Sequence, residues 1–388
     1  MSTVHNDING DPALVAVERA IHELRCGRAI YCRETDAPDP SRRGLLLAAA
    51  ETAPPALMAR LEKLAGEAGV ALAITRERAD ALGLRSTDSR SDGEGEAVLL
   101  RLRQPVSASL VSWLAGVNAE NNRISIAGHR DVSVEACDAL TAATLKLAKR
   151  ARLLPAVLVI ASPPPTEDVL AVSAVQLEAL VGPSALELER VCEARVPLAG
   201  HEDCKLVLFR DRLDASEHVA VVIGSPKSTA TSVRLHSACL TGDLLASLRC
   251  DCGDQLRGAV DQLAAVGGGV LLYLAQEGRG IGLANKLRAY ELQDAGLDTL
   301  EADRHLGFSA DERSYAAAAS MLRHLGLTRI QLLTNNLEKI EALQKAGIEV
   351  VAGQRLIGAI NRHNVRYVHA KRERAGHLMP EINMDEIL

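Results

Sequence analysis

The sequence of 388 residues is poor in aromatic side chains, with two Phe, five Tyr and one Trp. The apolar part is rich in Ala, Leu and Val, which suits helices packed on sheets better than an aromatic-rich β-sandwich. No apolar run approaches the about 20 residues that span a bilayer, and the polar first residues lack the apolar core of a signal peptide. We therefore expect a soluble, cytoplasmic protein that does not bind membranes.

Excess positive charge is also lacking, since the formal net charge is −6. Such a balance argues against nucleic acid as a partner, although basic residues can still gather around one small anion. Thiols stay reduced in the cytoplasm, so the eight cysteines are expected to be buried thiols, metal ligands or catalytic groups. Five of them are scattered and are predicted to be packing residues: Cys26, Cys32, Cys137, Cys192 and Cys204.

The chain is long enough for two domains, which we place at 1–175 and 185–388, with the boundary between Pro163 and Glu189. In the first half, hydrophobic periodicity predicts helices over 15–24, 55–65, 134–151 and 169–181, and strands over 29–32, 70–74 and 156–160. Residues 87–96 are predicted to be a surface loop and 162–168 a proline-rich break.

The second half alternates more regularly. Strands are predicted over 219–223, 232–235, 270–274, 330–333 and 348–351, and helices over 255–265, 285–295, 313–325 and 338–346. This alternation predicts an α/β fold class, with α+β-type mixed sheets.

Three further cysteines, Cys239, Cys250 and Cys252, are spaced by eleven and then two residues. A Cys-x-Cys pair can present both sulfurs from one turn, and a third thiolate then fills another corner of a tetrahedron. Three protein ligands leave a position for water, which is typical of catalytic zinc. Two alternatives stay open here: three core cysteines, or a closed structural site with His236 as fourth ligand.

Three other segments carry polar groups in patterns that suit a nucleotide. The loop from Gln276 to Tyr290 has three glycines within five residues after a predicted buried strand, as phosphate-cradling loops do. Asp311 and Arg313 stand at a predicted helix start, and the segment Thr334–Lys339 follows a predicted strand, where open α/β sheets bind ligands. The alternatives are structural: a tight turn for the first segment, and helix N-caps for the other two.

The segment from about Glu189 to Leu378 resembles GTP cyclohydrolase II, through HSACLTGDLLASLRCDCG, QEGRGIGLANKLRAYELQDAGLDT, LGFSADER and LLTNN. The resemblance implies that Cys239, Cys250 and Cys252 bind zinc. It implies that Asp311 is the proton acceptor, Arg313 the nucleophile and Tyr290 a further catalytic residue. The nucleotide contacts that it implies are Arg234, Leu235, His236, Ser237, Ala238, Gln255, Glu277, Gly278, Arg279, Thr299, Thr334 and Lys339.

The resemblance further implies hydrolysis of GTP, with release of formate and pyrophosphate and formation of a diaminopyrimidine ribosylamine phosphate, at the start of riboflavin synthesis. One Zn²⁺ per subunit would activate the water that attacks C8, and Mg²⁺ would accompany the triphosphate. A homodimer is also implied. Ala238 and Ala275 depart from the Glu and Arg that the family often has there. They leave two alternatives: a relative acting on another purine nucleotide, or a non-catalytic nucleotide-binding protein.

Residues 14–160 more faintly resemble 3,4-dihydroxy-2-butanone 4-phosphate synthase, through GLLLAAAETAPPALMARL and GVALAITRERADALGL. That family needs an acidic loop of the kind ENEGDL, but this chain has SRRGLL. Ser41, Arg43 and Leu45 stand where the carboxylates should be, and a divalent cation needs such oxygen ligands. We therefore expect this domain to be degenerate and non-catalytic.

Overall fold

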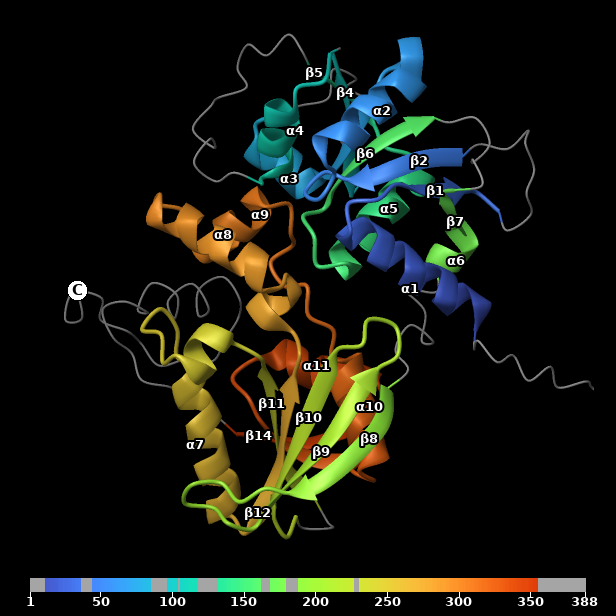
Figure 1. Ribbon diagram of the computed structural model, residues 1–388. Helices are drawn as coiled ribbons and strands as arrows, with labels where there is room; N and C mark the ends of the chain where they lie inside the picture. Colours follow the sequence, from blue (N-terminus) through green and yellow to red (C-terminus); the bar gives the residue numbers. More distant parts are fainter. Residues whose placement is uncertain are drawn as a thin grey trace, which may run out of the picture. The chain divides into compact units, whose positions relative to one another are not determined.

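The computed structural model describes residues 11–35, 44–84, 96–103, 105–117, 132–161, 168–178, 188–226 and 230–354. The chain forms two compact units (Figure 1). The first comprises Met1–Ala185, Leu287–Leu297 and Glu301–Asp311, and the second comprises Leu186–Lys286, Asp298–Leu300 and Glu312–Leu388. Two segments that the sequence analysis placed in the C-terminal domain, 287–297 and 301–311, therefore pack within the first unit.

A seven-stranded sheet, in the order β5-β4-β3-β6-β2-β1-β7, forms the centre of the first unit. All neighbours in it are antiparallel except β1 and β7, which are parallel. Its strands are β1 (Ile30–Arg33), β2 (Gly44–Ala49), β3 (Ala71–Thr75), β4 (Ala97–Leu102), β5 (Val132–Ala136), β6 (Ala156–Ala161) and β7 (Leu170–Ser173).

Helices pack against both faces of this sheet (Figure 1). Leu61 and Trp113, from α2 and α4, join Leu72 and Leu158 of the sheet in one apolar core. Alternate strand residues point to the other face, where α1 contacts β7 and α5 contacts β6. The helices are α1 (Pro12–Arg25), α2 (Pro55–Ala65), α3 (Arg76–Ala81), α4 (Ala108–Ala115), α5 (Ala139–Arg150) and α6 (Ala174–Glu178). The unit also holds parts of α8 (Leu283–Asp294) and α9 (Thr299–His305).

The second unit has its own seven-stranded sheet, in the order β14-β13-β11-β12-β10-β9-β8. The four strands β14, β13, β11 and β12 run parallel, whereas β10, β9 and β8 continue the sheet in antiparallel pairs. The strands are β8 (Leu188–Arg195), β9 (Cys204–Asp211), β10 (Glu217–Gly224), β11 (Thr231–Ser237), β12 (Gly268–Leu274), β13 (Arg329–Leu333) and β14 (Glu349–Gln354).

Opposite faces of the second sheet carry different helices (Figure 1). α7 (Cys252–Ala265) packs Ala259 and Leu263 against Leu271. On the other face, α10 (Ala316–His324) and α11 (Leu337–Lys345) pack against Val270 and Leu272. Because β11, β12 and β13 are parallel, their carboxyl ends meet at one edge, which is where such sheets hold ligands.

The expected α/β class with mixed sheets is confirmed, but three predicted helices differ from the structure. In place of a helix over 134–151, β5 runs to Ala136 and pairs with β4 before α5 begins at Ala139. In place of a helix over 169–181, β7 pairs with β1 and only a short α6 follows. The helix predicted to begin at Arg313 begins at Ala316, after the N-cap Tyr315, so the N-cap alternative for Asp311 is wrong.

Several other expectations are answered only in part. Cys32 and Cys204 are buried, as predicted, but Cys26 and Cys192 are exposed, so packing does not explain these two. The described residues leave out most of three predicted features. These are the loop 87–96, the break at 162–168 and the domain boundary between Pro163 and Glu189. Among the described residues, no helix is long and apolar enough to cross a membrane.

Candidate metal and nucleotide site

The three spaced cysteines come together in the second unit. Cys239 follows β11, and Cys252 is the first residue of α7, two positions after Cys250. Their sulfur atoms all lie within 4.8 Å of one another, and those of Cys239 and Cys250 are 3.7 Å apart. In a tetrahedron with Zn–S bonds of about 2.3 Å, the sulfurs stand about 3.8 Å apart. The cluster therefore fits zinc, and three unrelated core cysteines do not explain it.

The sulfur cluster fits against Gly242 because this residue has no side chain. A Cβ atom on Gly242 would stand 2.7 Å from the Cys250 sulfur and 3.1 Å from the Cys239 sulfur. The backbone N–H of Gly242 also donates to the Cys239 sulfur, at 3.3 Å. The turn Leu240–Leu244 thus wraps its backbone around the cluster, which a side chain at position 242 would prevent.

A buried ion pair lies directly against the cluster. The Lys286 ammonium donates to the sulfur of Cys239 at 3.1 Å, to the Thr241 hydroxyl at 3.0 Å and to Glu277 at 2.6 Å. Glu277 in turn accepts the backbone N–H of Leu240 at 2.7 Å. Hydrogen bonds from Cys250 and Cys252, together with the Lys286 charge, hold the pKa of the Cys239 thiol well below its usual range. Thiolates are the form in which cysteines bind metals, so a cation beside Cys239 suits a metal ligand.

Asp243, on the same turn, binds three groups next to the cluster through its carboxylate. It accepts hydrogen bonds from the His236 ring at 3.0 Å, the Tyr273 hydroxyl at 3.0 Å and the backbone N–H of Cys239 at 3.0 Å. The His236 ring also stacks on Tyr273, with centroids 5.6 Å apart, and burial lowers the pKa of His236. Among the described residues, the metal-binding group contains the three cysteines alone, so the alternative of His236 as fourth ligand is not supported.

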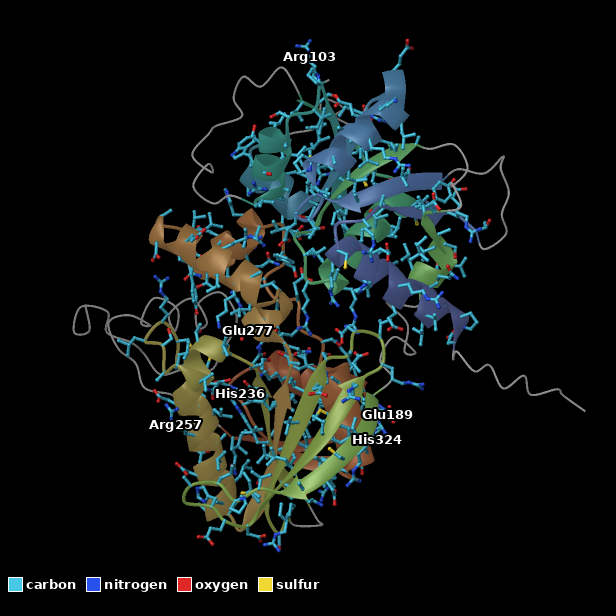
Figure 2. The ribbon with its side chains drawn as sticks, in the orientation of Figure 1. Arg103, Glu189, His236, Arg257, Glu277 and His324 are labelled. Atoms are coloured by element: carbon cyan, nitrogen blue, oxygen red, sulfur yellow. The ribbon has the colours of Figure 1, made fainter. Side chains whose placement is uncertain are left out.

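Three of the predicted nucleotide contacts, Arg234, Gln255 and Lys339, are joined by hydrogen bonds to the ends of the parallel strands or to one another. The buried Arg234 guanidinium donates to the Leu333 carbonyl at 2.8 Å and to Gln255 at 2.6 Å, joining β11 to β13 and α7. Burial lowers the pKa of Arg234 to about 10. The Lys339 ammonium donates to the Leu235 carbonyl at 3.1 Å. Figure 2 shows His236 and Glu277 toward this end of the sheet.

The glycine-rich loop has a left-handed backbone at a residue other than glycine. Gly278 and Arg279 both adopt left-handed conformations, with φ of 62° and 60°. Left-handed backbone at Arg279 is costly for a side-chain-bearing residue and is concentrated at functional sites. By contrast, the N-cap alternative for the last segment is partly confirmed: Asn336 caps α11 by accepting the N–H of Glu338 at 2.8 Å, while Thr334 precedes it.

Buried polar atoms that lack a partner within the described part of the chain lie at the same strand ends. Ser237 Oγ, at the end of β11, and Gln276 Oε1, after β12, are buried and have no hydrogen-bond partner among the described residues. Such atoms cost free energy unless a ligand or water satisfies them. The ring of Tyr315 lies 5.7 Å from the Arg313 guanidinium and 5.8 Å from the Lys339 ammonium. Tyr315 was not predicted, because only spatial proximity reveals its place beside these two cations.

The remaining predicted residues divide between the units. Thr299 and Arg313 belong to the second unit, whereas Tyr290 and Asp311 belong to the first. Ala238 and Ala275 directly follow a register pair of β11 and β12, Ser237 and Leu274, so they occupy adjacent strand ends. A Glu and an Arg at these two positions, as the family often has, would therefore be neighbours.

Comparisons with known proteins cover nearly the whole chain. Residues 189–355 match the family model of GTP cyclohydrolase II. A GTP cyclohydrolase-2 from Azospirillum brasilense is 43% identical over 381 residues, which are 95% of each chain. A GTP cyclohydrolase-2 from Xylella fastidiosa is 37% identical over 401 residues, 98% of this chain and 90% of that one. Among solved structures, a two-domain 3,4-dihydroxy-2-butanone 4-phosphate synthase from A. baumannii is 18% identical, with a TM-score of 0.29, over 88% of this chain and 99% of that one.

Proposed function

Because the chain belongs to the GTP cyclohydrolase II family, we propose that its second unit binds one zinc ion through Cys239, Cys250 and Cys252 and binds GTP at the neighbouring strand ends. As a member of this family, the chain hydrolyses GTP to 2,5-diamino-6-(5-phosphoribosylamino)pyrimidin-4(3H)-one, the first step of riboflavin biosynthesis. Formate and pyrophosphate are released.

One observation carries the zinc proposal: three sulfurs converge around a turn that only glycine can complete at position 242. When bound, zinc supplies Lewis acidity that activates water near neutral pH, as attack on C8 of the purine requires. Cys239 is held for this role by Lys286 and by Asp243, which accepts the Cys239 backbone N–H. These partners correspond to the outer-shell groups that orient ligands in other metal sites.

The substrate contacts follow from charge and from unsatisfied polar atoms. Ser237 Oγ and Gln276 Oε1 are placed to bind polar groups of the nucleotide. Arg279, Arg313 and Lys339 supply positive charge for the triphosphate, with Mg²⁺ as its counterion. The family resemblance assigns Asp311 as proton acceptor, Arg313 as nucleophile and Tyr290 as a further catalytic residue. The homodimer and the cytoplasmic location stay predictions.

For the N-terminal domain we propose the absence of synthase activity. Of the three positions where that family's carboxylates would stand, Leu45 is a buried residue of β2 and 3% exposed. Ser41 and Arg43 lie outside the described residues. An apolar side chain in a strand interior cannot bind a divalent cation, and this supports the proposal.

The direct test is turnover of GTP by the purified chain with Mg²⁺ and Zn²⁺, with formate and pyrophosphate followed separately. We expect both products in equal amounts, and loss of formate when a chelator removes zinc. Parallel reactions with other purine nucleotides serve as controls. Formate from another nucleotide but not from GTP would contradict the proposed substrate site, and full activity of metal-free protein would contradict the zinc proposal.

A further inference from the structure

Part of the predicted catalytic machinery is built into the first unit. The chain leaves the second unit after Lys286 and returns to it at Glu312, apart from residues 298–300. The segments between these points carry Tyr290 and end at Asp311. Their conformation depends on what holds them inside the first unit.

The firmest attachment is a buried arginine at the start of α3. Arg78 is 1% exposed, and its guanidinium donates to the carbonyls of Leu114, at 2.9 Å, and Trp113, at 2.5 Å. It also donates to the carbonyl of His305, the last residue of α9. Carbonyls at the ends of helices lack partners in their own helix and attract positive charge. Arg78 thus joins the ends of α4 and α9.

A close contact lies just beyond the end of α9. The Thr75 hydroxyl, at the end of β3, donates to the Gly307 carbonyl at 2.8 Å. A Cβ on Gly307 would stand 2.8 Å from that hydroxyl oxygen and 3.0 Å from Pro155 Cγ. The next residue, Phe308, is 1% exposed, and Asp311 follows three positions later. Little freedom is therefore left to the backbone that leads to Asp311.

An ion pair performs a similar task near Tyr290. The Arg288 guanidinium, two residues earlier on α8, donates to Glu51 at 2.9 Å. The other carboxylate oxygen of Glu51 accepts the backbone N–H of Leu154 at 2.7 Å. Both side chains are mostly buried, with 19% and 12% exposed.

We propose that Thr75 and Arg78, in the degenerate N-terminal half, are positioning residues for the GTP reaction, because they fix the segment that ends at Asp311. The inference rests on the proposed role of Asp311. If so, the N-terminal half contributes to the GTP reaction although it lacks the acidic residues of the synthase loop.

The test compares one glycine from each of the two segments, Gly296 in 287–297 and Gly307 in 301–311. Gly307 has φ of +87° and no room for a Cβ, whereas Gly296 has φ of +107° and open space around its Cβ position. Alanine strains the backbone at both sites, but only Gly307→Ala pushes the segment away from Thr75. We expect kcat for formate release, per bound zinc, to fall about 10- to 100-fold below that of Gly296→Ala, because small displacements of reacting groups have effects of this size. The KM for GTP and the zinc content should match in the two variants.

A second pair of variants covers the case in which Gly307→Ala does not fold. Thr75→Val removes the hydroxyl, and Thr75→Ser keeps it. We expect the valine variant to lose kcat and the serine variant to retain it. Equal kcat per bound zinc within the folded pairs would overturn the inference, while formate release by the unaltered chain would leave the proposed function standing. An unaltered chain that released no formate would overturn both.

Discussion

Two seven-stranded sheets occur in one chain, but they differ in strand direction and in what collects at their ends. The first sheet has one parallel pair, β1 and β7, and its strands are antiparallel elsewhere. The second sheet has four adjacent parallel strands. Cys239 and Gln276 follow β11 and β12 of that parallel group, and Ser237 is the last residue of β11. The position of a ligand site therefore depends on where parallel strands end and not on the presence of a sheet alone.

Buried polar side chains also serve different purposes in the two units. In the first unit, Arg78 and Thr75 bind backbone carbonyls of the same unit and so fix one segment on another. In the second unit, Lys286 and Asp243 are directed toward a metal ligand. The buried polar side chains of the first unit thus hold its own backbone, whereas those of the second unit hold a metal ligand.

The largest expected effect comes from Cys252→Ser. Replacing one of three thiolates should remove most of the bound zinc and lower formate release by at least about 1,000-fold, because the proposed mechanism relies on zinc to activate the attacking water. Cys192→Ser, at an exposed cysteine of the same unit, is the matched control and should keep both zinc and activity. Zinc is measured by elemental analysis.

The same two variants test the contrast between the units. Given ribulose 5-phosphate, neither should form 3,4-dihydroxy-2-butanone 4-phosphate, and nor should the unaltered chain. Formation of that product by Cys252→Ser would show a working synthase in the first unit and would contradict the division of tasks.

Sequence patterns predicted elements well where the local period and the final packing agree. The helix predicted over 55–65 matches α2, and the strand over 270–274 lies within β12. Residues 132–136 were assigned to a helix in part, but pairing with β4 makes them a strand, since strand preference depends on neighbouring strands. β2 was missed because all six of its residues are buried, and a continuous apolar run has no alternation.

The site was predictable only as far as its motifs are local. The spacing of Cys239, Cys250 and Cys252 predicted a metal cluster, and the structure brings the sulfurs together. Lys286, however, is 47 residues from Cys239 in the chain, so no spacing rule could place its ammonium on that sulfur. Arg78 and His305 are 227 residues apart, and their contact depends on the whole fold of the first unit.

A smaller effect is expected from Lys286→Met, which tests whether the second unit tunes its metal ligands. The substitution removes the hydrogen bond to Cys239 and leaves Glu277 without its ammonium partner. Loss of an outer-shell partner typically costs about 10- to 100-fold in metal affinity, and we expect a weakening of that size in competition with a chelator. Lys345→Met, at an exposed lysine in the last turn of α11, is the control. Equal zinc affinity in the two variants would show that Lys286 does not support the site.

The smallest effect concerns the edge of the nucleotide site, where Ala238 and Ala275 end adjacent strands. Because these positions are neighbours, Ala238→Glu and Ala275→Arg together should form an ion pair. A partly exposed pair contributes about 0–1 kcal/mol, so the KM for GTP should change no more than about fivefold in the double variant. Each single variant adds a charge without that partner and should raise the KM more than the double variant does. Strictly additive effects in this cycle would contradict the pairing, whereas coupling would show that these parallel strand ends accept a charge pair.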